Sequence, residues 1–142
     1  MRSALVAVLL LACACATPIG VTHADTQSMC RSLSASVLSS DRPSQYSEQL
    51  LTRLGLGARF DRDPELVLAA LREPGEGLSR EFLFVPAELS FYHAVKSQKA
   101  EYFLASAVYA YAFALGRAEG PRIDPIDPRV RLAVNLYNLG LA

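Results

Sequence analysis

Two cysteines near the amino end, Cys13 and Cys15, have the surroundings of a thiol that becomes acylated. They follow a positive start at Arg2 and an uncharged apolar run over residues 4–12, and small residues surround them. This is the three-part plan of an export signal. The lipoprotein signal peptidase accepts a cysteine preceded by small and aliphatic residues, after the thiol has received a diacylglyceryl group. We expect lipidation at Cys15, with Cys13 as the alternative, because the longer apolar run then lies wholly upstream.

The apolar run is shorter than the roughly 20 residues that a membrane-spanning helix needs, so we expect a lipid anchor. Each buried CH₂ of an acyl chain contributes about 0.8 kcal/mol, and two or three chains hold a protein stably. The sequence thus predicts an exported, membrane-anchored lipoprotein of the bacterial cell envelope. The alternative is a secreted or periplasmic protein cleaved after Ala24. With Cys13 removed and Cys15 acylated, Cys30 is the only free thiol and no intramolecular disulfide can form.

The sequence predicts no catalytic site. A serine hydrolase needs a nucleophile on a tight turn, a histidine base and an orienting acid. The chain has no GlyXaaSerXaaGly, and its nearest fragment, residues 77–81, lacks the second glycine. The two histidines are His23, before the predicted module, and His93, among aromatic and aliphatic neighbours. We interpret His93 as a structural residue and expect no enzyme activity from this chain.

No metal, cofactor or nucleic-acid partner is predicted either. HisGluXaaXaaHis, CysXaaXaaCys and a phosphate-binding glycine loop are all absent from the sequence, and 14 basic residues balance 14 acidic ones. Four aspartates beside prolines or at expected helix starts are explained by capping: Asp61, Asp63, Asp124 and Asp127. The tyrosines at 102, 109 and 111 are expected in the core, and a pocket lined by them is the alternative.

The elements that would carry such residues are helical. The 142 residues, 51% of them hydrophobic, predict one domain at most. Short turns rich in Pro, Gly or Asp separate helix patterns, and no period-2 alternation predicts a sheet. We therefore expect an all-α bundle of five or six short helices in residues 28–142, after a signal at 1–14 and a tether at 15–27. The expected helices are 28–38, 45–54, 64–72, 80–95, 100–115 and 129–139.

Residues 80–115 predict an antiparallel hairpin like that of tetratricopeptide proteins. Alanines alternate with aromatic residues in this segment, which lets two helices pack closely. No second copy at a period of about 34 residues is present, which argues against a peptide-binding solenoid. Pro86 is expected to kink the first helix or to delay its start. Residues 102–115 are the most apolar part of the module, so we expect them at the centre of the fold.

Several segments together resemble one family, the bacterial exported lipoproteins that continue into an α/β-hydrolase domain of esterase or lipase type. The segments include CysAlaThrProIleGlyVal, AlaGluLeuSerPheTyrHisAla, AlaValTyrAlaTyrAlaPhe and the final AspProArgValArgLeuAlaValAsnLeuTyrAsn. The resemblance implies a helical amino-terminal module, with the sheet and its serine nucleophile following later. Only Cys15 matches a functional position of the family. Because the chain ends at Ala142 before any hydrolase strand, we expect it to be truncated.

The expected last helix has apolar residues around its surface, which predicts a partner on more than one side. The residues expected to meet this partner are Val130, Leu132, Val134, Leu136 and Tyr137. We therefore expect a membrane-anchored, non-catalytic accessory module of an α/β-hydrolase-type lipoprotein. The alternative is a free-standing envelope lipoprotein that binds a partner protein through its helical hairpin.

Overall fold

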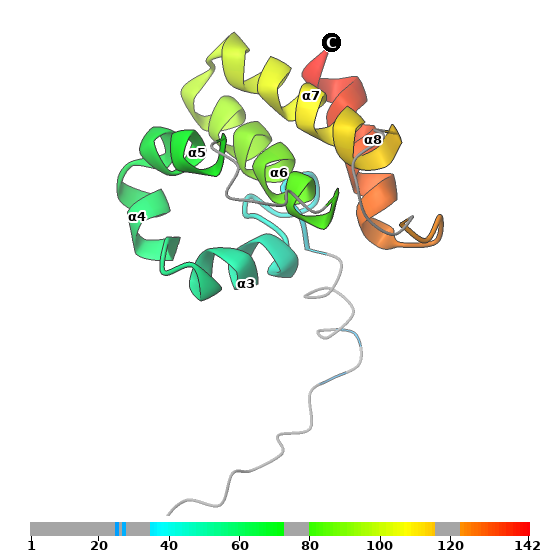
Figure 1. Cartoon of the computed structure of the whole chain (residues 1–142), viewed down its shortest axis with the longest axis horizontal. Helices are drawn as coiled ribbons and strands as arrows, with labels where there is room; N and C mark the ends of the chain where they lie inside the picture. The colour runs from blue at the N-terminus through cyan, green and yellow to red at the C-terminus, as the bar shows by residue number, and fades with distance from the viewer. Residues whose placement is uncertain (1–24, 26, 28–34, 73–79, 116–122) are drawn as a thin grey trace, which may run out of the picture.

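Six α-helices make up most of the part of the chain that the computed structural model describes, residues 25, 27, 35–72, 80–115 and 123–142 (Figure 1). They are α3 (Gln45–Arg53), α4 (Gly57–Arg62), α5 (Pro64–Arg72), α6 (Arg80–Ser97), α7 (Ala100–Leu115) and α8 (Pro128–Gly140). Within these residues no strand occurs. The predicted all-α class with about six short helices is confirmed. The signal at 1–14 and nearly all of the tether at 15–27 lie outside the described residues.

The predicted helix starts are confirmed where a side chain caps the first turn. Ser44 Oγ accepts a hydrogen bond from Ser47 N at 3.5 Å at the start of α3. Asp63 Oδ1 accepts from Leu66 N at 3.1 Å before α5, and Asp127 Oδ1 accepts from Arg129 N at 2.8 Å before α8. Such bonds satisfy backbone N–H groups that have no partner inside the helix. The starts were predictable because capping involves only neighbours in sequence.

The expected helix over residues 28–38 does not extend through 35–38, which form an irregular segment and a turn. Ser36 O accepts from the backbone N of Ser39 and of Ser40, at 3.0 and 2.8 Å, and Ser36 N donates to Ser39 Oγ at 3.0 Å. Serine hydroxyls compete with the backbone for hydrogen bonds and favour turns over helix. The expectation was therefore wrong at these four residues, and residues 28–34 lie outside the described part. Helix α4, in turn, was not expected.

The predicted hairpin is confirmed in α6 and α7. The turn between them is two residues long and includes Gln98 with φ 57°, and the paired residues run in opposite directions along the two helices. Ser106 Oγ on α7 donates to Ala87 O on α6 at 2.8 Å. Ala94 and Ala110 are fully buried, so small side chains let the helices approach closely. Pro86 lies inside α6, which is one continuous helix from Arg80 to Ser97.

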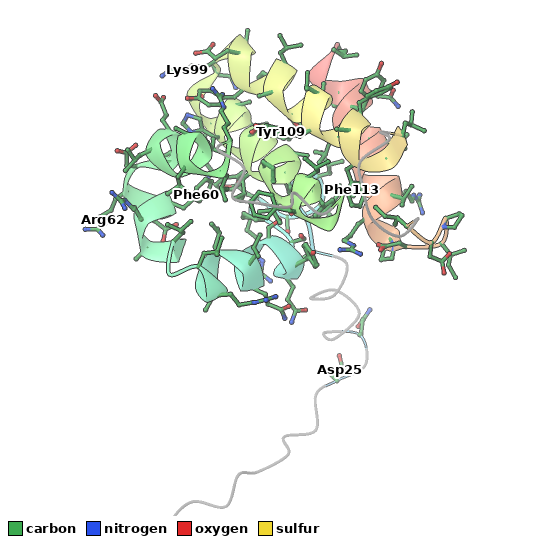
Figure 2. The ribbon with its side chains drawn as sticks, viewed as in Figure 1. Asp25, Phe60, Arg62, Lys99, Tyr109 and Phe113 are labelled. Carbon is green, nitrogen blue, oxygen red and sulfur yellow. The ribbon has the colours of Figure 1, made fainter. Side chains whose placement is uncertain are left out.

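The centre of the fold is α6, and the expectation that residues 102–115 would take this place was wrong. Nearly every described side chain from Leu83 to Ala94 is buried, because α3, α5, α7 and α8 all pack against α6. Figure 2 shows Phe60 and Phe113 pointing into this core, whereas Arg62 and Lys99 lie at its outside. Helix α7 packs mainly against α6 and α8, which leaves one of its faces to solvent.

Helices α7 and α8 lie in close contact at Gly140. A Cβ atom at this position would lie 2.6 Å from Phe103 O and 3.1 Å from Ala107 Cβ. Any larger residue would therefore push α8 away from α7. The end of α8 is thus held firmly along α7, and this places the surfaces of the two helices side by side.

Candidate functional site

The residues that sequence analysis connected with chemistry lie mostly outside the described part of the chain. This holds for both early cysteines, Cys13 and Cys15, and for the hydrolase-like fragment at 77–79. His93 is described and lies on α6, where it is buried. Of the three tyrosines, Tyr102 is buried, Tyr109 is half-buried and Tyr111 is exposed, and none of them lines the groove between α3 and α8 that is described below.

A buried carboxylate that the sequence analysis missed stands at the centre of a polar cluster. Glu88 on α6 is 0% exposed, and its Oε1 accepts from the backbone N of Ser44 at 2.9 Å and of Val37 at 3.3 Å. Its Oε2 accepts from the hydroxyls of Ser44 and Ser47, both at 2.6 Å. The signal in the sequence was an acidic residue within a mostly apolar stretch, ValProAlaGluLeuSerPhe.

The four donors determine what the Glu88 cluster can do. A carboxylate offers about four acceptor positions, and all four here are occupied by groups of the protein. Both serine hydroxyls point their protons at the same oxygen, and this oxygen has no acceptor position left to withdraw a proton from a reacting group. The cluster attaches residues 37–47 to the central helix, and its geometry suits a structural joint better than a general base.

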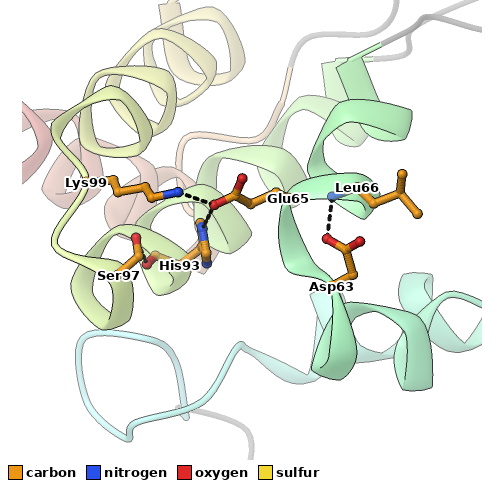
Figure 3. A network of polar contacts seen from close by, with 6 residues as sticks. All are labelled: Asp63, Glu65, Leu66, His93, Ser97 and Lys99. Carbon is orange, nitrogen blue, oxygen red and sulfur yellow. Dashed lines mark hydrogen bonds and ion pairs between the residues drawn. The ribbon is translucent and has the colours of Figure 1, made fainter.

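A second polar network joins α5, α6 and the start of α7 on the surface (Figure 3). Glu65 Oε1 accepts from Lys99 Nζ at 2.5 Å and lies 3.3 Å from His93 Nε2. The His93 ring meets the Tyr102 ring edge-on, with centroids 4.5 Å apart. His93 is therefore held between an acid and an aromatic ring.

Charge and burial shift three pKa values in this network. The hydrogen bonds from Lys99 and then His93 lower the pKa of Glu65 below its ordinary value. The bond to Glu65 raises the pKa of Lys99. Burial raises the pKa of Tyr102, and the negative charge of Glu65 adds to this effect. The shifts of Glu65 and Lys99 keep both groups charged at neutral pH, and the shift of Tyr102 keeps its hydroxyl protonated.

A groove with a volume of about 720 Å³ lies between the starts of α3 and α8. At its edge Asp127 binds Arg129 through both carboxylate oxygens, with Arg129 Nη2 2.6 Å from Oδ2. The Arg129 guanidinium also stacks on Tyr46, 4.5 Å from the ring centroid. The Arg129 bonds lower the pKa of Asp127. This pair fixes α8 against α3 and forms one wall of the groove.

An apolar surface runs along α7 and α8, and we call it the α7–α8 face. On α7 it consists of Leu104, Val108, Tyr111 and Leu115, which are 56%, 59%, 51% and 70% exposed. Spacings of four, three and four residues place these side chains in one row. The Tyr111 ring contacts the Tyr137 ring on α8 at 5.9 Å, and the exposed Val134 and Leu141 lie on the same side of α8 as Tyr137.

The five residues of α8 that were expected to meet a partner do not form one surface. Leu136 is fully buried in the chain's own core, and Val130 is half-buried against it. Leu132 is half-buried and faces the groove beside α3. Only Val134 and Tyr137 belong to the α7–α8 face. The α7 part of this surface was missed because the apolar residues of α7 were all assigned to the core.

Within the described ranges, no group of three or more His, Cys, Asp or Glu residues could hold a metal ion. The described helices also include none that is long and apolar enough to cross a membrane. No protein-family model matches the chain, and comparison with curated proteins and with solved structures found no significantly similar protein.

Proposed function

We propose that this chain is a membrane-anchored, non-catalytic helical module of an exported lipoprotein, and that its α7–α8 face binds the apolar surface of another protein domain. The exposed apolar row on α7 is the observation on which the proposal is based. By the resemblance of the sequence, the domain bound is an α/β-hydrolase of esterase or lipase type, which makes the chain an accessory module. The anchor is the acylated Cys15, with Cys13 as the alternative.

The composition of the α7–α8 face supports a protein partner. Contiguous exposed apolar patches are rare on soluble monomers and commonly mark interaction sites. Glu101 is the only charged residue on α7, and it lies in the first turn, before the row begins. Two aromatic rings, Tyr111 and Tyr137, meet within the face, and aromatic side chains are enriched at protein interfaces. An uncharged and mainly aliphatic partner surface would complement this row.

A non-catalytic role is supported by the state of the polar residues. The Ser44 and Ser47 hydroxyls both donate to the fully occupied Glu88 carboxylate. His93 lies between Glu65 and Tyr102 and approaches neither serine in the described contacts. On this proposal, Glu88 and His93 of α6 therefore stabilise the fold. A catalytic nucleophile, on this proposal, belongs to the partner domain.

The anchor is tested by labelling expressing cells with a radioactive fatty acid. The wild-type chain should carry the label, and Cys15→Ser should lose it. If the label is lost in Cys13→Ser but kept in Cys15→Ser, the acylated residue is Cys13. A wild-type chain without label contradicts the anchor, while leaving the role of the α7–α8 face to a separate test.

The partner is tested by placing a photo-crosslinking amino acid at Val108 in the full chain, in living cells. Arg53, exposed at the end of α3 and outside the face, is the matched control position. We expect one discrete adduct from position 108, and we expect it to react with a fluorophosphonate, the general probe of serine hydrolases. An adduct that does not react supports the alternative, a free-standing lipoprotein with another partner. An adduct yield equal to that of position 53 contradicts docking through this face.

A further inference from the structure

The groove between α3 and α8 is a second candidate binding surface, separate from the α7–α8 face. Its volume of about 720 Å³ lies within the usual range of ligand sites, roughly 300–1,000 Å³. Three side chains give it an apolar floor, namely the buried Phe84, the half-buried Tyr46 and Leu132. Both helices begin on the same side of the molecule, so the groove opens beside two helix starts (Figure 1).

Both walls of the groove carry polar side chains one helical turn apart. Gln45 and Gln49 lie on α3, and Arg131 and Asn135 lie on α8. All four are exposed, and within the described part of the chain none of their side chains forms a hydrogen bond or an ion pair. Each amide has donor and acceptor groups that an occupant of the groove can use.

The spacing of these four polar side chains matches that of an extended peptide backbone. Residues four apart on an α-helix are separated by about 6 Å along the axis, at about 1.5 Å per residue. An extended strand repeats its side-chain direction every two residues, or about 6.6–6.8 Å. The two amides on α3, and Arg131 with the Asn135 amide on α8, can therefore reach successive backbone groups that point the same way. Alternate side chains of the peptide would then face the apolar floor.

Charge indicates one further feature of the occupant. Asp127 is engaged by Arg129 through both oxygens, so this pair adds no net charge to the groove. Arg131 adds one positive charge, whereas the starts of α3 and α8 already lie beside the carboxylates of Glu88 and Asp127. We infer that the groove binds an extended peptide segment of another protein, with alternating apolar residues and a carboxylate that lies beside Arg131.

The inference is tested with the purified full chain and a defined probe. The probe is a pool of fluorescein-labelled hexapeptides of the form apolar-Ser-apolar-Ser-apolar-Asp, with Val, Leu or Phe at the apolar positions. A second pool has Asn in place of Asp. Fluorescence anisotropy should show saturable binding of the Asp pool, and weaker binding of the Asn pool by several-fold.

Variants then place the binding in the groove. Gln49→Ala combined with Asn135→Ala should weaken binding about tenfold, the effect of losing two hydrogen bonds. Arg131→Ala should remove the preference for Asp over Asn. The controls are Asn138→Ala, which replaces another asparagine of α8, and Arg53→Ala, which replaces an arginine of α3. Both positions lie outside the groove, and both variants should bind as the wild type does.

Circular dichroism checks that each variant is folded, which is expected because all of the replaced side chains are exposed. Absence of saturable binding up to about 1 mM peptide overturns the inference, since binding weaker than about −4 kcal/mol is non-specific for such a site. Equal affinity of the double variant and the controls overturns it as well. If the wild type binds both pools with equal affinity, the claim that the bound peptide places a carboxylate beside Arg131 is wrong. The photo-crosslinking at Val108 is independent of all these outcomes.

Discussion

Helices α6 and α7 pack along each other as one hairpin, but their polar residues and their exposure are distributed in opposite ways. On α6, three polar side chains are buried, namely Glu88, Ser90 and His93. On α7, the most apolar helix, the row of Leu104, Val108, Tyr111 and Leu115 is exposed. The helix with more polar residues is therefore the centre of the core, whereas the more apolar helix keeps one apolar face exposed.

The number of neighbours explains the difference. Helix α6 is surrounded by α3, α5, α7 and α8, so each of its faces meets protein and its polar groups must find partners there. Glu88 finds four donors, and Ser106 of α7 turns toward Ala87 O. Helix α7 has α6 and α8 as its main neighbours, so among the described residues its third side stays exposed. The apolar composition of that side is what supports the proposed docking of another protein there.

The largest expected effect comes from removing the central carboxylate. Glu88→Ala leaves the buried Ser47 hydroxyl, the half-buried Ser44 hydroxyl and two backbone N–H groups without their acceptor, and a fully buried group in this state costs about 1–3 kcal/mol. Because the serines can partly turn to other acceptors, we expect a loss of about 3–5 kcal/mol in the free energy of unfolding, measured in urea. Glu88→Gln should lose nearly as much, because its NH₂ group would face donors.

The matched control is Glu101→Ala, an exposed acid in the first turn of α7, which should change stability by less than about 0.5 kcal/mol. A Glu88→Ala variant as stable as Glu101→Ala would show that the polar cluster does not hold α3 to α6. The buried polar residues of α6 would then no longer distinguish it from α7.

A smaller effect is expected where α8 meets α7. Gly140→Ala places a methyl group 2.6 Å from Phe103 O, and a backbone oxygen inside a helix cannot move aside alone. We expect a loss of about 1–3 kcal/mol in the free energy of unfolding, as for other overpacked sites. Gly57→Ala in α4, whose Cβ would meet nothing within 4 Å, is the control and should be neutral or slightly stabilising. Equal stability of the two variants would mean that α8 is not held against α7 at this point.

The smallest effect is expected at the surface network of Glu65, His93 and Lys99. The pKa of Glu65 is lowered from its ordinary value of 4.5, so its pairing stabilises the fold above that pH and is lost as the pH falls through the lowered value. Glu65→Gln should therefore lower the melting temperature slightly at pH 7, and the difference from the wild type should shrink below pH 4.5. Glu101→Gln serves as the control. A difference that is unchanged or larger at low pH would rule out this charge effect.

Much of the fold could be predicted because its signals are local. Ser44, Asp63 and Asp127 cap helices through contacts within three residues, and the sequence shows such patterns directly. The bounds of α7 agree with the expected 100–115 because a turn precedes it and its composition is uniform. The hairpin itself followed from alternating small and aromatic residues.

The candidate sites could not be predicted in the same way because they depend on distant contacts. Glu88 is buried only because Ser44 and Ser47 approach it from more than 40 positions away in the chain. The groove needs the starts of α3 and α8 side by side, and helical periodicity does not reveal that proximity. The row on α7 has the pattern of a core stripe, and only the arrangement of the other helices leaves it exposed.

The most direct test of the contrast compares one leucine on each helix of the hairpin. Leu89 on α6 is 0% exposed and Leu104 on α7 is 56% exposed. Urea unfolding should show that Leu89→Ala loses about 2–5 kcal/mol, whereas Leu104→Ala changes stability by less than about 0.5 kcal/mol. Losses of equal size would contradict the account, because Leu104 would then be packed within the chain itself and no apolar face would remain for a partner.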